Sequence, residues 1–165
     1  MMFHYTNFLM PFCNWAENTS FGNLIKTNAW LFPFVEIFHL ISLGLLGGAI
    51  LTLNLRLLGL RYRRFSTAQL ARDVQPWMIG SLVGMLVTGF FLFSSEAVRM
   101  HGNAAFRLKM IALPVAIIFT FTSYRKAVLS EDTAISPLKG RLIALTSLVL
   151  WAVVGLAGRA IGYVQ

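Results

Sequence analysis

Apolar residues run along this chain in four long stretches, which are separated by shorter stretches where polar and basic residues gather. A helix rises 1.5 Å per residue, so about 20 apolar residues cross the hydrocarbon core of a bilayer. The pattern therefore predicts an all-α integral membrane four-helix bundle that occupies residues 30–165 as one domain. The expected spans cover about 30–55, 76–95, 106–124 and 142–160.

Residues 1–29 have a different pattern, in which aromatic residues mix with polar ones and no run is long enough to span. Aromatic rings suit the boundary between lipid and water, so we expect an N-terminal interfacial segment; a docking arm for a partner subunit is the alternative. Pro11 is expected to break any helix here, and Ser20 to cap a short helix through Lys26. No cleavable signal peptide is visible, and we expect the first apolar stretch to be retained as a signal anchor.

Composition and charge favour a membrane protein over a soluble one. The chain is 57% hydrophobic and 12% charged, with a mean hydropathy of +0.70, whereas a soluble domain has about 25% charged residues. The net charge of +8 comes from basic residues that cluster between apolar stretches, so we expect no nucleic-acid binding. Loops 56–75 and 125–141 are predicted to be cytoplasmic in a bacterial inner-membrane protein with both termini periplasmic. The first of these loops carries Arg56, Arg61, Arg63, Arg64 and Arg72.

Two ionisable residues lie inside the first apolar stretch. Glu36 and His39 are three residues apart, so a helix places them on one face. Each costs roughly 2.5 kcal/mol or more at membrane depth unless a partner or cavity receives it, which makes a functional site the default hypothesis. Gly47 lies three turns further along this face and would let a flat ligand approach, while Gly44 and Gly48 favour helix packing.

Basic residues of later stretches are predicted to lie at the same side of the membrane. Arg107 and Lys109 open the third stretch, Arg159 ends the fourth, and His101 lies in the short loop before the third. A buried Glu36 needs a cation, and Lys109 or Arg159 are the candidates.

Three interpretations of these residues stay open. In the first, Glu36 pairs with a cation only to fix the register of the helices, and His39 hydrogen-bonds a neighbour. In the second, His39 is an axial ligand of a b-type haem, whose propionates pair with Arg107, Lys109 or Arg159. The third is a proton or metal-ion path, or a site for a quinone head.

The haem interpretation lacks a second histidine within a span. His101 lies in a loop and His4 in the N-terminal segment, and Met85 or Met100 would be less usual partners. Otherwise the iron would have one-sided ligation, or its second axial ligand would come from another subunit.

The chain resembles a family of small bacterial four-helix membrane proteins that is known as a domain of unknown function. The resemblance implies the fold without an activity. It rests on Trp30, Phe32-Pro33, Glu36-x-x-His39, Leu55-Arg56-Leu57-Leu58-Gly59, Pro76-Trp77, Gly89-x-x-Leu92-Phe93 and Phe106-x-x-Lys109. The usual D-L-R-L-L-G of that family has Asn54 at its first position here.

The layout is more distantly similar to copper-resistance D-type and protoporphyrinogen-oxidase-type membrane proteins. These pair a histidine of the first helix with a lysine of a later one, and some bind haem. The comparison implies a site of Glu36, His39 and Lys109, by analogy of fold alone.

We therefore expect a small inner-membrane subunit that binds haem b and passes electrons between a periplasmic partner and the quinone pool. The alternatives are a cofactor-free accessory or assembly subunit of a larger membrane complex, and an ion or copper permease. The common nucleotide-binding and hydrolase motifs are absent from the sequence, so a non-catalytic or electron-transfer subunit is favoured over an enzyme.

Overall fold

Four long helices make up most of the computed structural model, all of them long and apolar enough to cross a membrane. They are α3 (Leu31–Leu57), α4 (Thr67–Ser95), α6 (Ala104–Phe119) and α8 (Pro137–Ala160). A π-helical turn, η1 (Thr120–Tyr124), continues α6. The predicted all-α fold with four spanning helices is confirmed. The structure describes residues 4–28, 30–61, 64, 66–126 and 136–163.

Polar residues at the helix starts explain where these helices begin. The Ser66 hydroxyl accepts the backbone N–H of Gln69 at 3.1 Å, and this cap starts α4 at Thr67. Pro76, which was expected in the first turn of the second span, therefore lies inside α4. At the other end of the preceding helix, Gly59 has a φ of 74°, a left-handed conformation that ends α3.

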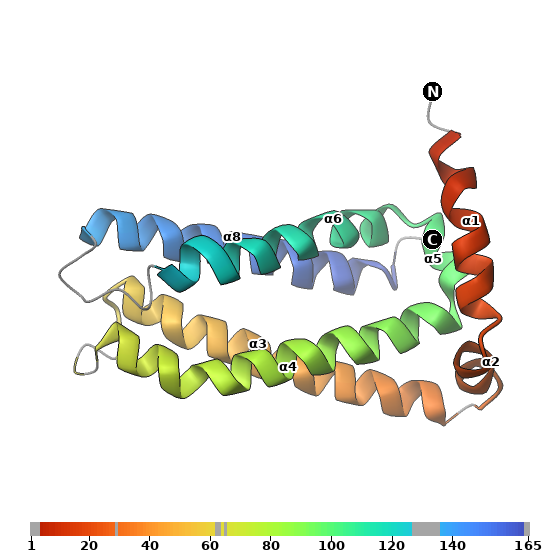
Figure 1. Cartoon of the computed structure of the whole chain (residues 1–165), viewed down its shortest axis with the longest axis horizontal. Coiled ribbons are helices and arrows are strands. Elements are labelled where there is room, and N and C mark those ends of the chain that lie inside the picture. Colours follow the sequence, from red (N-terminus) through yellow and green to blue (C-terminus); the bar gives the residue numbers. More distant parts are fainter. Residues whose placement is uncertain (1–3, 29, 62–63, 65, 127–135, 164–165) are drawn as a thin grey trace.

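The long helices form two pairs, α3 with α4 and α6 with α8, as Figure 1 shows. Leu46 and Ile50 of α3 and Leu82 of α4 are buried in one cluster. Side chains of α6 and α8, among them Ile117 and Trp151, pack against that cluster and join the pairs. α4 and α6 contact each other through side chains: the Phe93 and Phe106 rings stack with centroids 5.4 Å apart towards the α1 end, and Ile117 packs on the central cluster. The two pairs are thus joined at the centre of the bundle and again near α5.

Two N-terminal helices lie at the end of the bundle where α3 begins. Figure 1 shows α1 (His4–Glu17) crosswise to the long helices, next to α2 (Ser20–Thr27) and α5 (Ala97–His101). The expectation that Pro11 breaks a helix here is wrong, because α1 runs through it. Burial of its last turns against α5 offsets the cost of the proline. The cap of α2 is Thr19 rather than Ser20, through the N–H of Gly22 at 3.2 Å.

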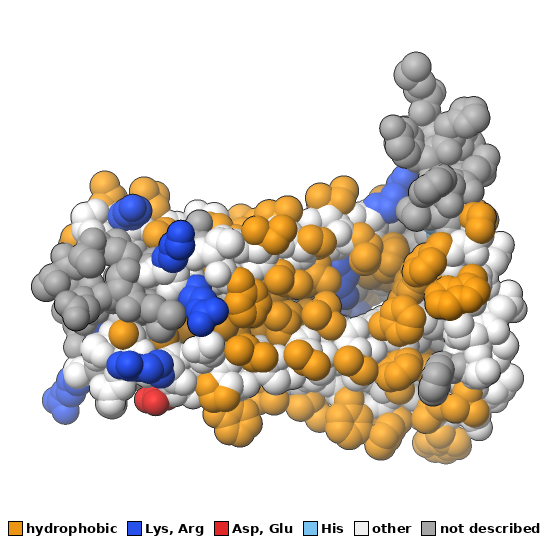
Figure 2. Space-filling view, viewed as in Figure 1, with side chains coloured by type: hydrophobic (Ala, Val, Ile, Leu, Met, Phe, Trp, Pro, Cys, Tyr) orange, Lys and Arg blue, Asp and Glu red, His pale blue; other side chains and the backbone are white. Residues whose placement is uncertain are grey.

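The outer surface of the bundle is suited to lipid. Large apolar side chains of every long helix are exposed, including Leu40, Ile111 and Leu156, and Figure 2 shows them along the middle of the molecule. Basic side chains gather in the same view at the end opposite α1. This is the end where α3 ends and where α4 and α8 begin. The expected loops 56–75 and 125–141 are shorter in the structure, because residues 67–75 belong to α4 and residues 137–141 to α8, and Arg63 lies outside the described residues. The chain is therefore a multi-pass membrane protein whose apolar helices contact the bilayer.

Candidate functional site

The His39 side chain is held between the first two long helices. Its Nδ1 lies 2.9 Å from the Thr88 hydroxyl oxygen on α4. That hydroxyl donates its own proton to the Gly84 carbonyl of the preceding turn, at 2.6 Å. Thr88 must therefore accept at the imidazole, so the proton of His39 lies on Nδ1. The imidazole also makes a hydrogen bond with the Met85 backbone.

This assignment leaves the second ring nitrogen of His39 as a free base. A neutral imidazole with its proton on Nδ1 carries a lone pair on Nε2. Among the described residues, Thr88 is the side-chain partner of the imidazole, and it contacts Nδ1. An imidazole that donates through one nitrogen and keeps the other free has the arrangement found in metal-ligating histidines.

Glycines of α4 allow the imidazole to lie this close to the helix. A Cβ added at Gly89 would come within 3.2 Å of the His39 Cε1, so the ring packs directly on the backbone there. One turn earlier, a Cβ at Gly84 would be 2.8 Å from the Ser42 hydroxyl oxygen of α3. The close approach of α3 and α4 therefore depends on small residues of α4.

Lys109 faces the same interior from the second helix pair. Its side chain is half-buried, and a Cβ added at Gly158 of α8 would lie 3.3 Å from its Nζ. Its charge acts on His39 across the gap between the pairs. Among the described residues Lys109 makes no ion pair. A histidine base and an unpaired ammonium group thus share one region of the membrane interior.

A hollow between α4 and α6 is visible in Figure 2 on the side towards α1, with a basic side chain inside it and apolar walls. His39 lies about 12 Å from the start of α3, and Lys109 about 8 Å from the start of α6, at 1.5 Å per residue. Both depths are on this side of the central cluster around Leu46, which closes the space between the pairs further along. The arrangement offers a ligand a nitrogen base and a positive charge in an apolar setting.

Glu36 and Arg159 do not join this pair. The Glu36 side chain is exposed and has no ion-pair partner in the part of the chain that the structure describes, in place of the expected pair with Lys109 or Arg159. It lies less than two turns from the start of α3, where a carboxylate can reach water at the headgroups. Arg159 instead lies 4.7 Å from the Tyr163 ring centroid and donates to its hydroxyl.

The other predicted site residues are dispersed around this end of the bundle. Arg107 is exposed, and His101 is half-buried on α5 and makes no hydrogen bond with His39 among the described residues. Gly47 is exposed, and a Cβ there would meet nothing within 4 Å, as at Gly44 and Gly48. The side chain of His4 lies outside the described residues. The structure thus brings together His39 and Lys109 out of the predicted set.

Thr88 is the site residue that sequence reasoning missed. The one feature of the sequence that indicates Thr88 is its position four residues after Gly84. This spacing is equally typical of a stripe of small residues for helix packing. In the described parts of the chain, no group of three or more His, Cys, Asp or Glu residues could hold a metal ion.

A model of a family of unknown function (DUF6644) matches residues 12–164, so the chain belongs to that family. No curated protein and no solved structure matches the chain.

Proposed function

We propose that this member of the DUF6644 family is a small membrane subunit that binds one b-type haem through His39 and takes part in electron transfer. The observation that supports the proposal is the contact of His39 Nδ1 with the Thr88 hydroxyl, whose own proton goes to the Gly84 carbonyl. With its proton on Nδ1, the imidazole would offer Nε2 to a haem iron. The haem would supply one-electron chemistry, and the protein would hold, orient and shield it.

The charges around the hollow support an anionic ligand with an apolar body. Lys109, half-buried and without an ion-pair partner among the described residues, is placed to receive a propionate. The exposed Arg107, further towards the start of α6, could receive another at the surface. The described residues bring no second imidazole to His39, so the proposal gives the iron one axial ligand from this chain. A partner subunit is the expected source of any second ligand and of the electrons, and quinone is the expected acceptor.

A haem titration of purified variants tests the ligand. Protein in detergent is titrated with haemin, and the Soret band is followed. His39→Ala should lose the band, whereas His101→Ala should keep it. Thr88→Val, which keeps the shape but not the acceptor, should weaken binding about tenfold or more, because removal of an outer-shell hydrogen bond to a ligating histidine costs that much.

Thr52→Val is the matched control for Thr88→Val. The Thr52 hydroxyl donates to the Gly48 carbonyl of its own helix at 2.8 Å and makes no hydrogen bond with His39. Its loss should leave haem affinity unchanged. A His39→Ala protein with the full Soret band would refute the assignment of the ligand.

A second candidate is a cofactor-free accessory subunit of a larger membrane complex. It is favoured by the side of α3 that carries Gly44, Gly47 and Gly48. A Cβ added at any of these glycines would meet no described residue within 4 Å. Such a face allows close approach by the helix of another subunit. This candidate predicts colourless protein from cells with ample haem, together with larger subunits that co-purify with it.

A further inference from the structure

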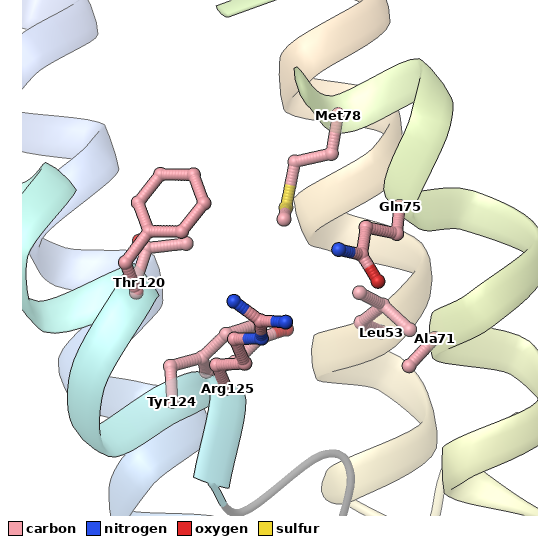
Figure 3. A pocket seen from close by; sticks show the side chains of 8 residues that line it. Leu53, Ala71, Gln75, Met78, Thr120, Tyr124 and Arg125 are labelled. Carbon is pink, nitrogen blue, oxygen red and sulfur yellow. The ribbon is translucent and has the colours of Figure 1, made fainter.

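A second, separate pocket lies at the opposite end of the bundle from His39. It is a small cavity of about 30 Å³, room for little more than a water molecule in its present shape. Its walls are mostly apolar and come from both helix pairs: Leu53 of α3, Met78 of α4 and Phe121 of η1 are among them. Figure 3 shows this space with the four polar side chains that also line it, Gln75, Thr120, Tyr124 and Arg125.

Tyr124 has an unpaired hydroxyl in this pocket. The residue is 2% exposed, and its hydroxyl finds no hydrogen-bond partner among the described residues. A buried hydroxyl without a partner is costly, and such groups are rare in native proteins. The π-helical turn η1, which carries Tyr124, is itself a form of helix often found at functional sites. Its hydroxyl is therefore poised to donate to an oxygen of a bound molecule.

Arg125 provides a positive charge at the mouth of the same pocket. Its side chain is exposed, and it makes no hydrogen bond or ion pair with the residues that the structure describes. Figure 3 shows the guanidinium group extending towards the Gln75 amide on the facing helix. Guanidinium and amide N–H groups that flank one space are donors for phosphate or carboxylate oxygens.

The position of the pocket relative to the membrane limits what can enter it. Tyr124 and Arg125 directly follow the third candidate span, which ends at Thr122. The pocket is therefore at headgroup level, at the end where the basic segments gather. Basic pockets between transmembrane helices at such an end take the headgroups of anionic lipids.

We propose that this pocket binds the phosphate of an anionic phospholipid. Arg125 and Gln75 hold the phosphate oxygens, and one ester oxygen accepts from the Tyr124 hydroxyl once the lipid widens the pocket. The acyl chain lies along the apolar wall of Met78 and Phe121. This inference does not depend on haem binding, since the two sites lie at opposite ends of the helices.

Lipid binding is measured on the intact protein in detergent by native mass spectrometry and by the rise in melting temperature on lipid addition. Phosphatidylglycerol should bind about fivefold more tightly than phosphatidylcholine, because one extra unit charge near several basic residues is worth about that factor. Arg125→Gln should bring this ratio close to one. Arg141→Gln is the control, because Arg141 lies at the start of α8, at the same end of the bundle, and does not line the pocket. This variant should keep most of the preference for phosphatidylglycerol.

Tyr124→Phe separates binding from folding. In detergent alone it should melt no lower than the wild type, because it removes a hydroxyl that lacks a partner. Its stabilisation by phosphatidylglycerol should nevertheless fall. Equal binding of both lipids, or an Arg125→Gln protein with an unchanged ratio, would overturn the proposal. Equal stabilisation by inorganic phosphate alone would also overturn it and assign the pocket to free phosphate.

Discussion

Asn54 of α3 is a polar residue that is completely buried between the helices of the bundle. It is 0% exposed, and its Nδ2 donates to the Ser147 hydroxyl of α8 at 3.3 Å. Its Oδ1 has no hydrogen-bond partner among the described residues. This hydrogen bond adds to the apolar cluster of Leu53 and Tyr124 that joins the two helix pairs at this level, which gives Asn54 a structural role in the fold.

Ser147→Ala should therefore destabilise the protein by about 0.5–2 kcal/mol, since the Asn54 amide would lose its partner in a buried setting. Thr146→Ala changes the adjacent exposed residue and should cost less. The measurement is thermal or SDS-induced unfolding in detergent micelles. Equal stability of the two variants would show that the Asn54–Ser147 contact adds nothing.

The sequence predicted the chemistry of individual residues better than their surroundings. His39 and Lys109 stand out because charged or basic groups are rare in apolar stretches, and they do share one interior. Glu36 stands out for the same reason, yet its side chain is exposed. Whether a residue points into a bundle depends on the rotation of its helix about its own axis. The apolar pattern cannot predict that rotation for a helix that is apolar on every side.

At the scale of helices, one carboxylate adds polar contacts to the apolar packing that holds the N-terminal arm of α1 and α2 on the bundle. Glu17 forms an ion pair with Lys26 of α2 and accepts the backbone N–H of Val98 on α5 at 3.1 Å. The hydrogen bond from Lys26 lowers the pKa of the Glu17 carboxyl below its ordinary value, and the Val98 N–H acts in the same direction. Gly22 fits so tightly at this junction that a Cβ would lie 2.7 Å from the Glu17 carbonyl oxygen.

Glu17→Gln should lower the melting temperature by about 1–3 °C near neutral pH, as expected for an ion pair whose lysine is exposed to solvent and whose carboxylate is half-buried. Because the pKa of Glu17 is lower in the folded protein, its stabilisation is complete above the ordinary carboxyl range. It disappears as the pH falls through the lowered value. The difference between wild type and variant, measured by thermal unfolding at several pH values, should therefore vanish in acid.

The matched control for this prediction is Glu96→Gln. Glu96 pairs at 3.2 Å with Arg99, a near neighbour in sequence, so its loss breaks no contact between the arm and the bundle. Its effect should be smaller near neutral pH. A Glu17→Gln difference that persisted unchanged in acid would mean that the ionised carboxylate does not fasten the arm.

Helix boundaries were harder to predict than helix positions. The apolar pattern located all four long helices, but α4 begins well before its apolar part, because Ser66 caps it in the polar loop. The helix through Pro11 could not be predicted locally, since contacts with α5, distant in sequence, stabilise it.

At the scale of the whole molecule, two helix pairs meet at a central apolar cluster and leave one chemically distinct site towards each end. The end near α1 holds an imidazole with a free nitrogen and a lysine. The basic end holds a phenol hydroxyl without a partner and an arginine in the described residues. The geometry of both sites depends on the distance between the two helix pairs. The spacing of apolar residues along the sequence does not predict that distance.

The absorption spectrum of the detergent-purified protein, oxidised and then reduced with dithionite, tests haem binding most directly. Protein from cells with ample haem should have a Soret band that shifts on reduction, with α and β bands appearing, and His39→Ala protein should have none of these features. A flat visible spectrum of the wild-type protein would contradict the proposed function and favour the cofactor-free subunit.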